Sequence, residues 1–358
     1  MHGNLIKYIY FDHSATTPIL PEVAEEINRC FTVYYGNASE PHTPGVEAKK
    51  ILERSRYIIG KSLGANSKEI VFTGSGTESD NLAIIGVAEA YKKKGNHIIT
   101  SAIEHPAVHI PLKKLSRQGF KITYIPVDKF GMIDPEDVKK SITSKTILVT
   151  IMHANNIVGT IQPISIIGKI LRERNIIFHT DAVQTFSNIK TDVNQLNVDL
   201  LSLSGHKIYG PKGVGALYIR KGTRIMPQIL GGGHERGIRS GTENIPGIAG
   251  LAKAAEIGQK NLSKKISKVT KLRDYLIKGL LDRIDEVRLN GHPTERLPGN
   301  CNFSFKYIEG ESIVLRLDRA GIATSSGSAC SSSSLKPSHT LIAMGLSNQE
   351  AYGSLRIT

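Results

Sequence analysis

The sequence predicts an α/β fold, with a large domain built on a mainly parallel sheet flanked by helices and a smaller α/β domain. Between about residues 69 and 220, short apolar runs alternate with helix-period segments, which is the pattern of strand–helix–strand units. After Gly247 the pattern changes to a long helical stretch followed by short strands. A chain of 358 residues is long enough for two such domains.

The individual elements follow from the spacing of apolar residues and from the turn residues that close each run. The expected strands of the large sheet are 69–73, 97–100, 121–127, 146–152, the run from 176 that ends in the acid Asp181, 200–204 and 215–220. The expected helices of this part are 21–31, 46–63, 135–141 and 164–174, with two more that end near 91 and 117. Farther along we expect a helix to about residue 284, strands at 287–290 and 302–305, and a helix at 312–320.

The composition argues against a disordered, a disulfide-stabilised or a membrane-spanning chain. Hydrophobic residues make up 40% of the sequence, no apolar run approaches the length of a membrane span, and the N-terminus does not resemble a signal peptide. The three cysteines, Cys30, Cys301 and Cys330, have no framework or metal-ligand spacing. A sparse, odd count fits a reducing compartment, so we expect a cytoplasmic protein.

The chain is strongly basic, with a formal net charge of +14. Two clusters contribute, at 49–61 and 260–278, and both lie on helical patterns without interleaved aromatic residues. This arrangement favours solvated helix faces over a nucleic-acid surface. A charge of this size leaves an acidic partner or direct RNA binding open.

Two strand ends carry the pair of residues that a pyridoxal phosphate (PLP) site needs. Lys207 follows the apolar run 200–204 in a tight glycine-containing loop, and Asp181 lies at the end of the preceding apolar run. An amine held against apolar surroundings has a lowered pKa, and the neutral amine can condense with an aldehyde. The acid would keep the pyridine nitrogen protonated. A surface lysine and a helix-capping aspartate would give the same local pattern, so both interpretations stay open at this point.

Other strand ends carry polar or glycine-rich motifs. Gly74 and Gly76 stand between a strand and a helix, where free backbone N–H groups can hold a phosphate. His105 follows the strand at 97–100, and Asn156 follows the next predicted strand but one. The segment 231–242 is glycine-rich with two arginines, which fits an anion-binding loop or a mobile connector. Taken alone, each motif is also compatible with an ordinary turn or cap.

Cys330 lies in a serine-rich run at 325–334. One interpretation is a flexible linker with an incidental cysteine. The one we favour is a mobile arm whose thiol must travel, because a thiol placed in Gly/Ser coil is exposed and oxidisable. Cys30 ends an apolar helix and Cys301 enters a strand, so we expect both to be structural.

Taken together, these segments resemble a known family across nearly the whole chain. They are Tyr10–Pro18 (YFDHSATTP), Phe72–Asn81 (FTGSGTESDN), Glu104–His105, His153–Asn156 (HANN), His179–Gln184 (HTDAVQ), Ser204–Lys207 (SGHK), Gly231–Arg236 (GGGHER), Arg239–Thr242 (RSGT) and Ser325–Cys330 (SSGSAC). The sequence resembles the PLP-dependent cysteine desulfurases of the NifS/IscS type, in the class V aminotransferase superfamily. The resemblance implies the PLP-dependent transferase fold type I.

The resemblance also implies roles for individual residues. Lys207 would bind the cofactor aldehyde and later move protons, Asp181 would pair with the pyridine nitrogen, and His105 would stack on the ring and act in acid–base steps. The other cofactor-binding residues would be Gly76, Thr77, Asn156, Gln184, Ser204 and His206, with Thr242 reaching in from a second subunit. The substrate would be bound by Asn37, Asn156 and Arg356.

Cys330 matches the family's nucleophile. Its thiolate would attack the sulfur of the bound cysteine, leaving L-alanine and a persulfide on the enzyme. No resident metal is implied, with Cys330 a candidate transient ligand of an Fe–S cluster. The implied partners are L-cysteine, a second copy of the chain, and a sulfur acceptor, either an Fe–S scaffold protein or a component of tRNA thiolation.

Two other functions compete with this one. The scaffold could serve another class V enzyme, an aminotransferase or a selenocysteine lyase. The basic charge also fits a catalytically silent scaffold that binds RNA or an acceptor protein.

The sequence departs from the family pattern in places. Ile157 replaces a usual acid, and Ala38 and Glu40 replace proline and serine. Family members continue for some tens of residues beyond the position of Thr358, so the C-terminal part of the small domain is expected to be incomplete. We expect the large domain to span 14–258 and the small domain to combine 1–13 with 259–358.

Overall fold

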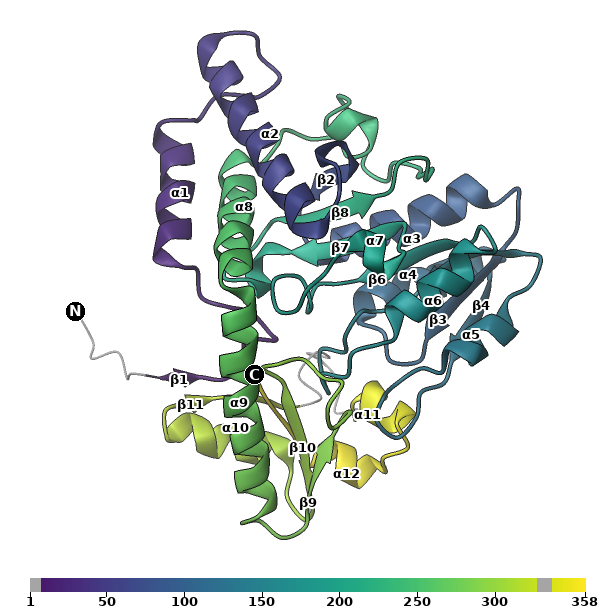
Figure 1. The fold of residues 1–358 in the computed structure, drawn as a ribbon, viewed down its shortest axis with the longest axis vertical. Coiled ribbons are helices and arrows are strands. Elements are labelled where there is room, and N and C mark those ends of the chain that lie inside the picture. The colour runs from purple at the N-terminus through teal and green to yellow at the C-terminus, as the bar shows by residue number, and fades with distance from the viewer. Residues whose placement is uncertain (1–7, 327–336) are drawn as a thin grey trace.

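A seven-stranded sheet forms the centre of the larger part of the molecule. The computed structural model describes residues 8–326 and 337–358, and Figure 1 shows the large sheet in its upper part. The strand order is β2-β8-β7-β6-β5-β3-β4. The strands are β2 (Ile70–Thr73), β3 (His97–Ser101), β4 (Lys121–Ile125), β5 (Thr146–Thr150), β6 (Ile177–Asp181), β7 (Leu200–Ser204) and β8 (Gly215–Ile219). Within this sheet only β8 runs opposite to its neighbours, so the predicted mainly parallel sheet is confirmed.

Alternate residues of these strands enter two separate hydrophobic cores, one on each face of the sheet. On β2, for example, Ile70 and Phe72 join one core while Val71 joins the other. The second core is closed by α3 (Gly76–Tyr91) and α4 (Pro106–Arg117). The first is closed by α1 (Pro21–Thr32), α2 (Thr43–Leu63), α5 (Pro135–Ser141), α6 (Ile164–Arg172), α7 (Val193–Leu196) and α8 (Ile245–Lys260). Burial on both faces explains why the strands appear in the sequence as continuous apolar runs.

A smaller sheet lies below the large one in Figure 1, beside α9 (Leu262–Leu281). Its order is β12-β13-β10-β9, with β9 (Val287–Asn290), β10 (Cys301–Phe305), β12 (Ser325–Ser326) and β13 (Ser354–Ile357). The helices of this part are α10 (Gly310–Arg319), α11 (His339–Ala343) and α12 (Asn348–Tyr352). The N-terminal β1 (Ile9–Tyr10) pairs with β11 (Ile322–Ala323), so the two ends of the chain meet here. This pairing supports the predicted division into two domains, which stays a prediction.

The structure corrects several predicted boundaries. The long helical stretch after Gly247 is two helices, because Asn261 between them has non-helical dihedrals (φ −120°, ψ 16°). The predicted end of the strand at the acid Asp181 is confirmed; there the Asp181 carboxylate accepts a hydrogen bond from the Val183 N–H. The predicted strand 146–152 ends earlier, at Thr150.

The elements missed from the sequence are short. Among the helices and strands of the described residues they are β1, α7 and, beyond residue 320, β11, β12, α11, α12 and β13. Segments of two to five residues show too little periodicity to be recognised, and partners distant in the sequence stabilise them.

The two basic clusters do lie on helices, α2 and α9. Most of their lysines are exposed or half-buried, but Arg56 and Arg273 are buried. Among the residues described, no helix is both long enough and apolar enough to cross a membrane.

Candidate active site

A cavity of about 340 Å³ lies at the carboxyl ends of the parallel strands. The strands β2, β3, β5, β6 and β7 each deliver the segment that follows them to its wall. Nine of the ten predicted cofactor-binding residues line it: Gly76, Thr77, His105, Asn156, Asp181, Gln184, Ser204, His206 and Lys207. Sequence positions spread over more than a hundred residues therefore converge because parallel strands end on the same side of a sheet.

Lys207 lies in a short 3₁₀ turn directly after β7. Its Nζ donates hydrogen bonds to the backbone carbonyls of Ser14 and Ala15, the second at 2.8 Å. The predicted apolar surroundings are therefore wrong, because polar backbone groups from the N-terminal segment surround this amine. The same segment holds the neighbouring residue, since Thr17 Oγ1 donates to the carbonyl of His206 at 3.0 Å.

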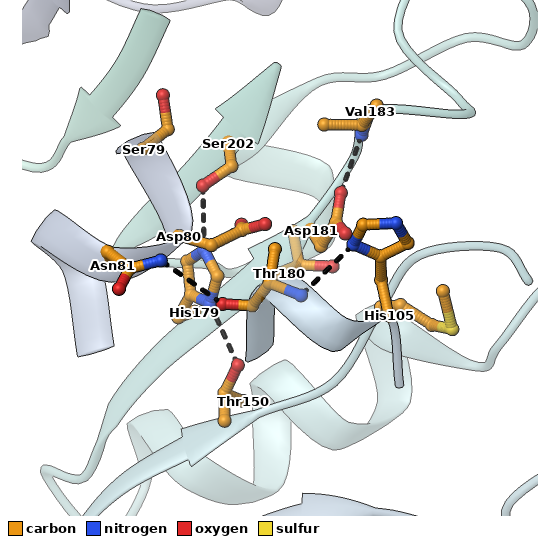
Figure 2. Close-up of polar contacts among 12 residues, drawn as sticks. Ser79, Asp80, Asn81, His105, Thr150, His179, Thr180, Asp181, Val183 and Ser202 are labelled. Carbon is orange, nitrogen blue, oxygen red and sulfur yellow. Dashed lines mark hydrogen bonds and ion pairs between the residues drawn. The ribbon is translucent and has the colours of Figure 1, made fainter. Parts of the chain in front are cut away.

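Asp181 is the last residue of β6, and its side chain is buried in the cavity wall. Figure 2 shows its carboxylate accepting the Val183 N–H, at 2.9 Å. Burial raises the pKa of Asp181, while His105 and Lys207 act to lower that pKa. The acid and the amine that the sequence paired thus belong to one site.

His105 caps the N-terminus of α4, where its Nδ1 accepts the Ala107 N–H at 3.1 Å. Burial lowers the pKa of His105, Asp181 acts against this, and Lys207 and His339 lower the pKa further. A neutral ring whose Nδ1 accepts a hydrogen bond carries its proton on Nε2. That nitrogen is then available as a donor.

The N-terminus of α3 lies in the wall of the cavity, which Ser75, Gly76 and Thr77 line. Ser75 is the N-cap and its Oγ accepts the Glu78 N–H; the other first backbone N–H groups of a helix have no partner within it and can hold an anion. A Cβ at Gly76 would lie 2.6 Å from Val183 Cγ2 and 3.4 Å from the Ser204 Cβ. Glycine therefore keeps this end open. Burial lowers the pKa of His206 to about 4, so this ring is neutral near pH 7.

The residues fit PLP on three counts. A lysine amine, a buried carboxyl group and a helix N-terminus line one cavity, which matches an aldehyde, a pyridine nitrogen and a phosphate. His105 lies on the cavity wall between the ends of β3 and β6, within interaction range of Asp181.

Three predicted residues lie outside the cavity, and a fourth lies outside the described residues. Arg356 on β13 is buried nearby, with Nη1 donating to the Asn156 carbonyl at 3.2 Å. Asn37 is exposed in the loop between α1 and α2, and its Oδ1 accepts the Ser39 N–H. Thr242 is exposed. The predicted nucleophile, Cys330, is outside the described residues.

The glycine-rich segment 231–242 is attached to its own chain. The Glu235 carboxylate accepts two hydrogen bonds from Arg56, at 2.7 and 2.8 Å, and is buried with it. Arg239 Nε pairs with Glu78 Oε1 at 2.7 Å, and Arg236 Nη2 donates to the Ile70 carbonyl. Both arginines of the segment are therefore held by groups of the same chain, and its role as an anion-binding loop stays a prediction.

Six other residues of the cavity wall were not predicted from the sequence: Ser14, Ala15, Ser75, Asp80, Met152 and Val183. Ser14 and Ala15 act through backbone carbonyls, which no side-chain motif reports. Asp80 lies one helical turn beyond Gly76 and also lines the cavity. The sequence did offer a signal for Asp80: it is a carboxylate on the mainly apolar buried side of a helix. It also stands four positions after Gly76, which places both on the same face of that helix.

The comparisons with known proteins agree with this geometry. The family model described as "Aminotransferase class-V" matches residues 9–358. The "Cysteine desulfurase IscS" of Dictyoglomus turgidum is 53% identical over 352 residues, which cover 98% of this chain and 89% of the relative. The "Cysteine desulfurase IscS" of Methanosarcina thermophila is 51% identical, covering 98% and 87%.

Solved structures give the same result. A "NIFS-LIKE PROTEIN" superposes with a TM-score of 0.92 at 41% identity, covering 98% of this chain and 93% of that one. A structure titled "SspA in complex with cysteine" has a TM-score of 0.85 at 37% identity, covering 98% of both chains. The chain therefore belongs to the class V aminotransferase family, together with the cysteine desulfurases of the NifS/IscS type.

Proposed function

We propose that this protein is a PLP-dependent cysteine desulfurase, which converts L-cysteine to L-alanine and retains the sulfur as a persulfide on Cys330. The observation that carries the proposal is the meeting of Lys207, Asp181 and the N-terminus of α3 in one cavity. The high identity to relatives named cysteine desulfurase supports it.

The residues that would hold PLP are those that line the cavity. Lys207 would bind its aldehyde, Asp181 would pair with its pyridine nitrogen, and His105 would stack on its ring. The phosphate would be held by Gly76, Thr77, Ser204 and His206, and the ring hydroxyl by Gln184 and Asn156. When bound, PLP supplies an electron sink for the carbon atoms of the substrate.

The chain's own residues supply the remaining chemistry. Lys207, released from the cofactor, would move protons to and from the substrate, and the neutral His105 would assist through Nε2. Arg356 would bind the substrate carboxylate, with Asn37 and Asn156 as further contacts. In the sulfur step, the Cys330 thiolate attacks the substrate sulfur, an S–S bond forms and the C–S bond breaks. The β-carbon takes up one proton to give alanine, so no external oxidant or reductant is needed.

We also propose the context of the reaction. The persulfide sulfur would pass to an acceptor, either an Fe–S scaffold protein or a component of tRNA thiolation. A homodimer would complete each site with Thr242 from the second subunit. Three dispersed cysteines fit a reducing cytoplasm.

The test uses the purified full chain with added PLP. We expect a visible absorbance band from the bound cofactor and release of alanine from L-cysteine. Lys207→Ala should abolish the band and lower alanine release by about 100- to 10,000-fold, because both proton transfer and cofactor attachment are lost. Cys330→Ala should keep the band and lose alanine release. Lys212→Ala, at an exposed lysine five positions later, is the matched control and should behave as the wild type.

Two outcomes contradict the proposal. Full activity of Cys330→Ala would favour an aminotransferase or a selenocysteine lyase, neither of which needs this thiol. A protein that stays colourless with excess PLP would favour the catalytically silent basic scaffold.

A further inference from the structure

A second aspartate lies in the wall of the cavity, beside Asp181. Asp80 belongs to α3, and its exposed fraction is only 1%. Its Oδ1 has no hydrogen-bond partner in the described part of the chain. A buried, ionised carboxyl group without a partner would be very unfavourable, so the charge state of Asp80 needs an explanation.

The nearest basic group, His179, gives Asp80 no positive charge. Figure 2 shows His179 between Thr150 and Ser202, with Nδ1 2.8 Å from Thr150 Oγ1 and Nε2 3.0 Å from Ser202 Oγ. Hydroxyl groups thus satisfy both ring nitrogens. Burial lowers the pKa of His179 to about 3, so its ring is neutral near pH 7. The 3.6 Å contact between His179 Nε2 and Asp80 Oδ1 is therefore not an ion pair.

Lys207 and His105 line the same cavity, but the charges that shift the pKa of Asp80 are those of two acids, Asp181 and Glu104. Burial raises the pKa of Asp80 well above its usual range, the negative charge of Asp181 raises it further, and a hydrogen bond from Ser202 acts against them. Glu104, between β3 and α4, raises the pKa of Asp80 further only when it is itself ionised. Burial also raises the pKa of Glu104 to about 8.

Asp181 is in the opposite situation. It accepts a backbone hydrogen bond from Val183, and His105 and Lys207 favour its charged form. Two adjacent buried carboxyl groups cannot both ionise without strong repulsion, so a negative charge settles on the one with partners.

We propose that Asp80 is a positioning residue that stays uncharged next to Asp181, so that Asp181 holds the negative charge of the pair. This inference rests on the proposed function, in which Asp181 pairs with the pyridine nitrogen. Asp80 then acts through Asp181. The neutral Asp80 carboxyl group packs in the cavity wall and keeps its hydrogen bond with Ser202, and Asp181 is left as the ionised acid that pairs with the cofactor.

The first test measures folding of the full chain without cofactor, by urea unfolding between pH 5 and pH 7. Folding raises the pKa of Asp80, so the folded state keeps a proton that the unfolded state releases above its pKa of about 3.9. Stability therefore falls as the pH rises. The ratio of the folding equilibrium constant of the wild type to that of Asp80→Asn should fall by up to about tenfold for each unit that the pH rises. Glu104 titrates in both proteins, so its effect largely cancels in the ratio.

Asp137→Asn, at an acid near the surface on α5, is the matched control, and its ratio to the wild type should not change with pH. A flat ratio for Asp80→Asn would overturn the proposal, because an ionised Asp80 takes up no proton on folding. This readout does not depend on cofactor binding.

The second test compares dissociation constants for PLP, measured by titration of the apo forms. Asn is the isosteric neutral replacement, so Asp80→Asn should bind PLP within about threefold of the wild type, whereas Asp181→Asn should bind at least tenfold more weakly. Equal losses in both variants would overturn the assignment of the charge to Asp181. If the wild type binds no PLP but the pH-dependent ratio is present, the neutral Asp80 stands and the proposed function fails.

Discussion

Arg356, which we propose as the residue that binds the substrate carboxylate, is a buried cation. Its side chain is only 2% exposed, and its Nη2 pairs with Asp12 Oδ1 at 2.6 Å. Its Nη1 donates to the Asn156 carbonyl, but its Nε has no hydrogen-bond partner within residues 8–326 and 337–358. A guanidinium held on two sides with one donor left over is suited to bind a carboxylate.

We therefore expect Arg356→Lys to raise the KM for L-cysteine by about 10- to 100-fold, since a hydrogen bond to a charged group contributes about 1.5–3 kcal/mol. The visible band of bound PLP should remain, because Arg356 lies outside the cofactor cavity. Steady-state kinetics with an absorbance spectrum checks both. Arg316→Lys, at a residue of α10 well separated in sequence, is the control. An unchanged KM would remove Arg356 from the substrate site.

At the scale of elements, a buried ion pair joins the segment 231–242 to α2, and a hydrogen bond joins it to the large sheet. Arg56 of α2 and Glu235 are both buried, and Glu235 also accepts the N–H of Phe72 on β2 at 2.9 Å. Glu235 and Arg236 adopt positive φ angles of 47° and 58°, a region that non-glycine residues seldom enter. The ion pair and these backbone contacts hold the segment in this conformation.

Removing one member of a buried pair leaves the other charge without compensation. We expect Arg56→Met to lower the free energy of unfolding by about 3–5 kcal/mol, as measured by urea unfolding. The matched control is Arg29→Met, which breaks the pair of the exposed Arg29 with Glu26 and should leave stability nearly unchanged. A loss in Arg56→Met as small as in the control would mean that water or another group replaces the arginine.

At the scale of the whole molecule, the cofactor site lacks one predicted contributor. Thr242 is exposed and absent from the cavity wall, while its neighbour Arg239 is tied to Glu78 of the same chain. A second subunit related by a two-fold axis could bring its own Thr242 to this cavity, and would receive Thr242 of the first in return.

Mixing two defective proteins tests this exchange. Lys207→Ala lacks the cofactor lysine, and Thr242→Ala lacks the contribution to its partner. In a heterodimer, one site combines Lys207 of the Thr242→Ala chain with Thr242 of the Lys207→Ala chain and is intact. About half of the dimers in an equal mixture are heterodimers, so about a quarter of all sites should be active. Alanine release at limiting PLP checks this. Arg239 must stay unchanged, because its pair with Glu78 supports the α3 segment of its own chain. No recovery, in a mixture shown to exchange subunits, would mean that the loop serves its own chain.

Much of the large domain could be predicted because its signals are local. Strands buried on both faces are continuous apolar runs, and turn residues mark their ends. Since parallel strands end on one side of a sheet, the strand-end residues Lys207, Asp181 and His105 could be assigned to one site before any contact was known. The small elements beyond residue 320 could not be predicted in this way, because β13 is stabilised by pairing with β10 and β12 rather than by its own pattern.

By itself, then, the sequence determined the α/β alternation, the family motifs and which strand-end residues are candidates for one site, since each is encoded within a few neighbouring positions. Only the tertiary structure decided which polar groups lie around them. The contacts of Lys207 with Ser14 and Ala15, and the position of Asp80 beside Asp181, join segments about a hundred or more residues apart. The charge state of a side chain depends on its burial and on such distant neighbours, and the local pattern of a sequence predicts neither.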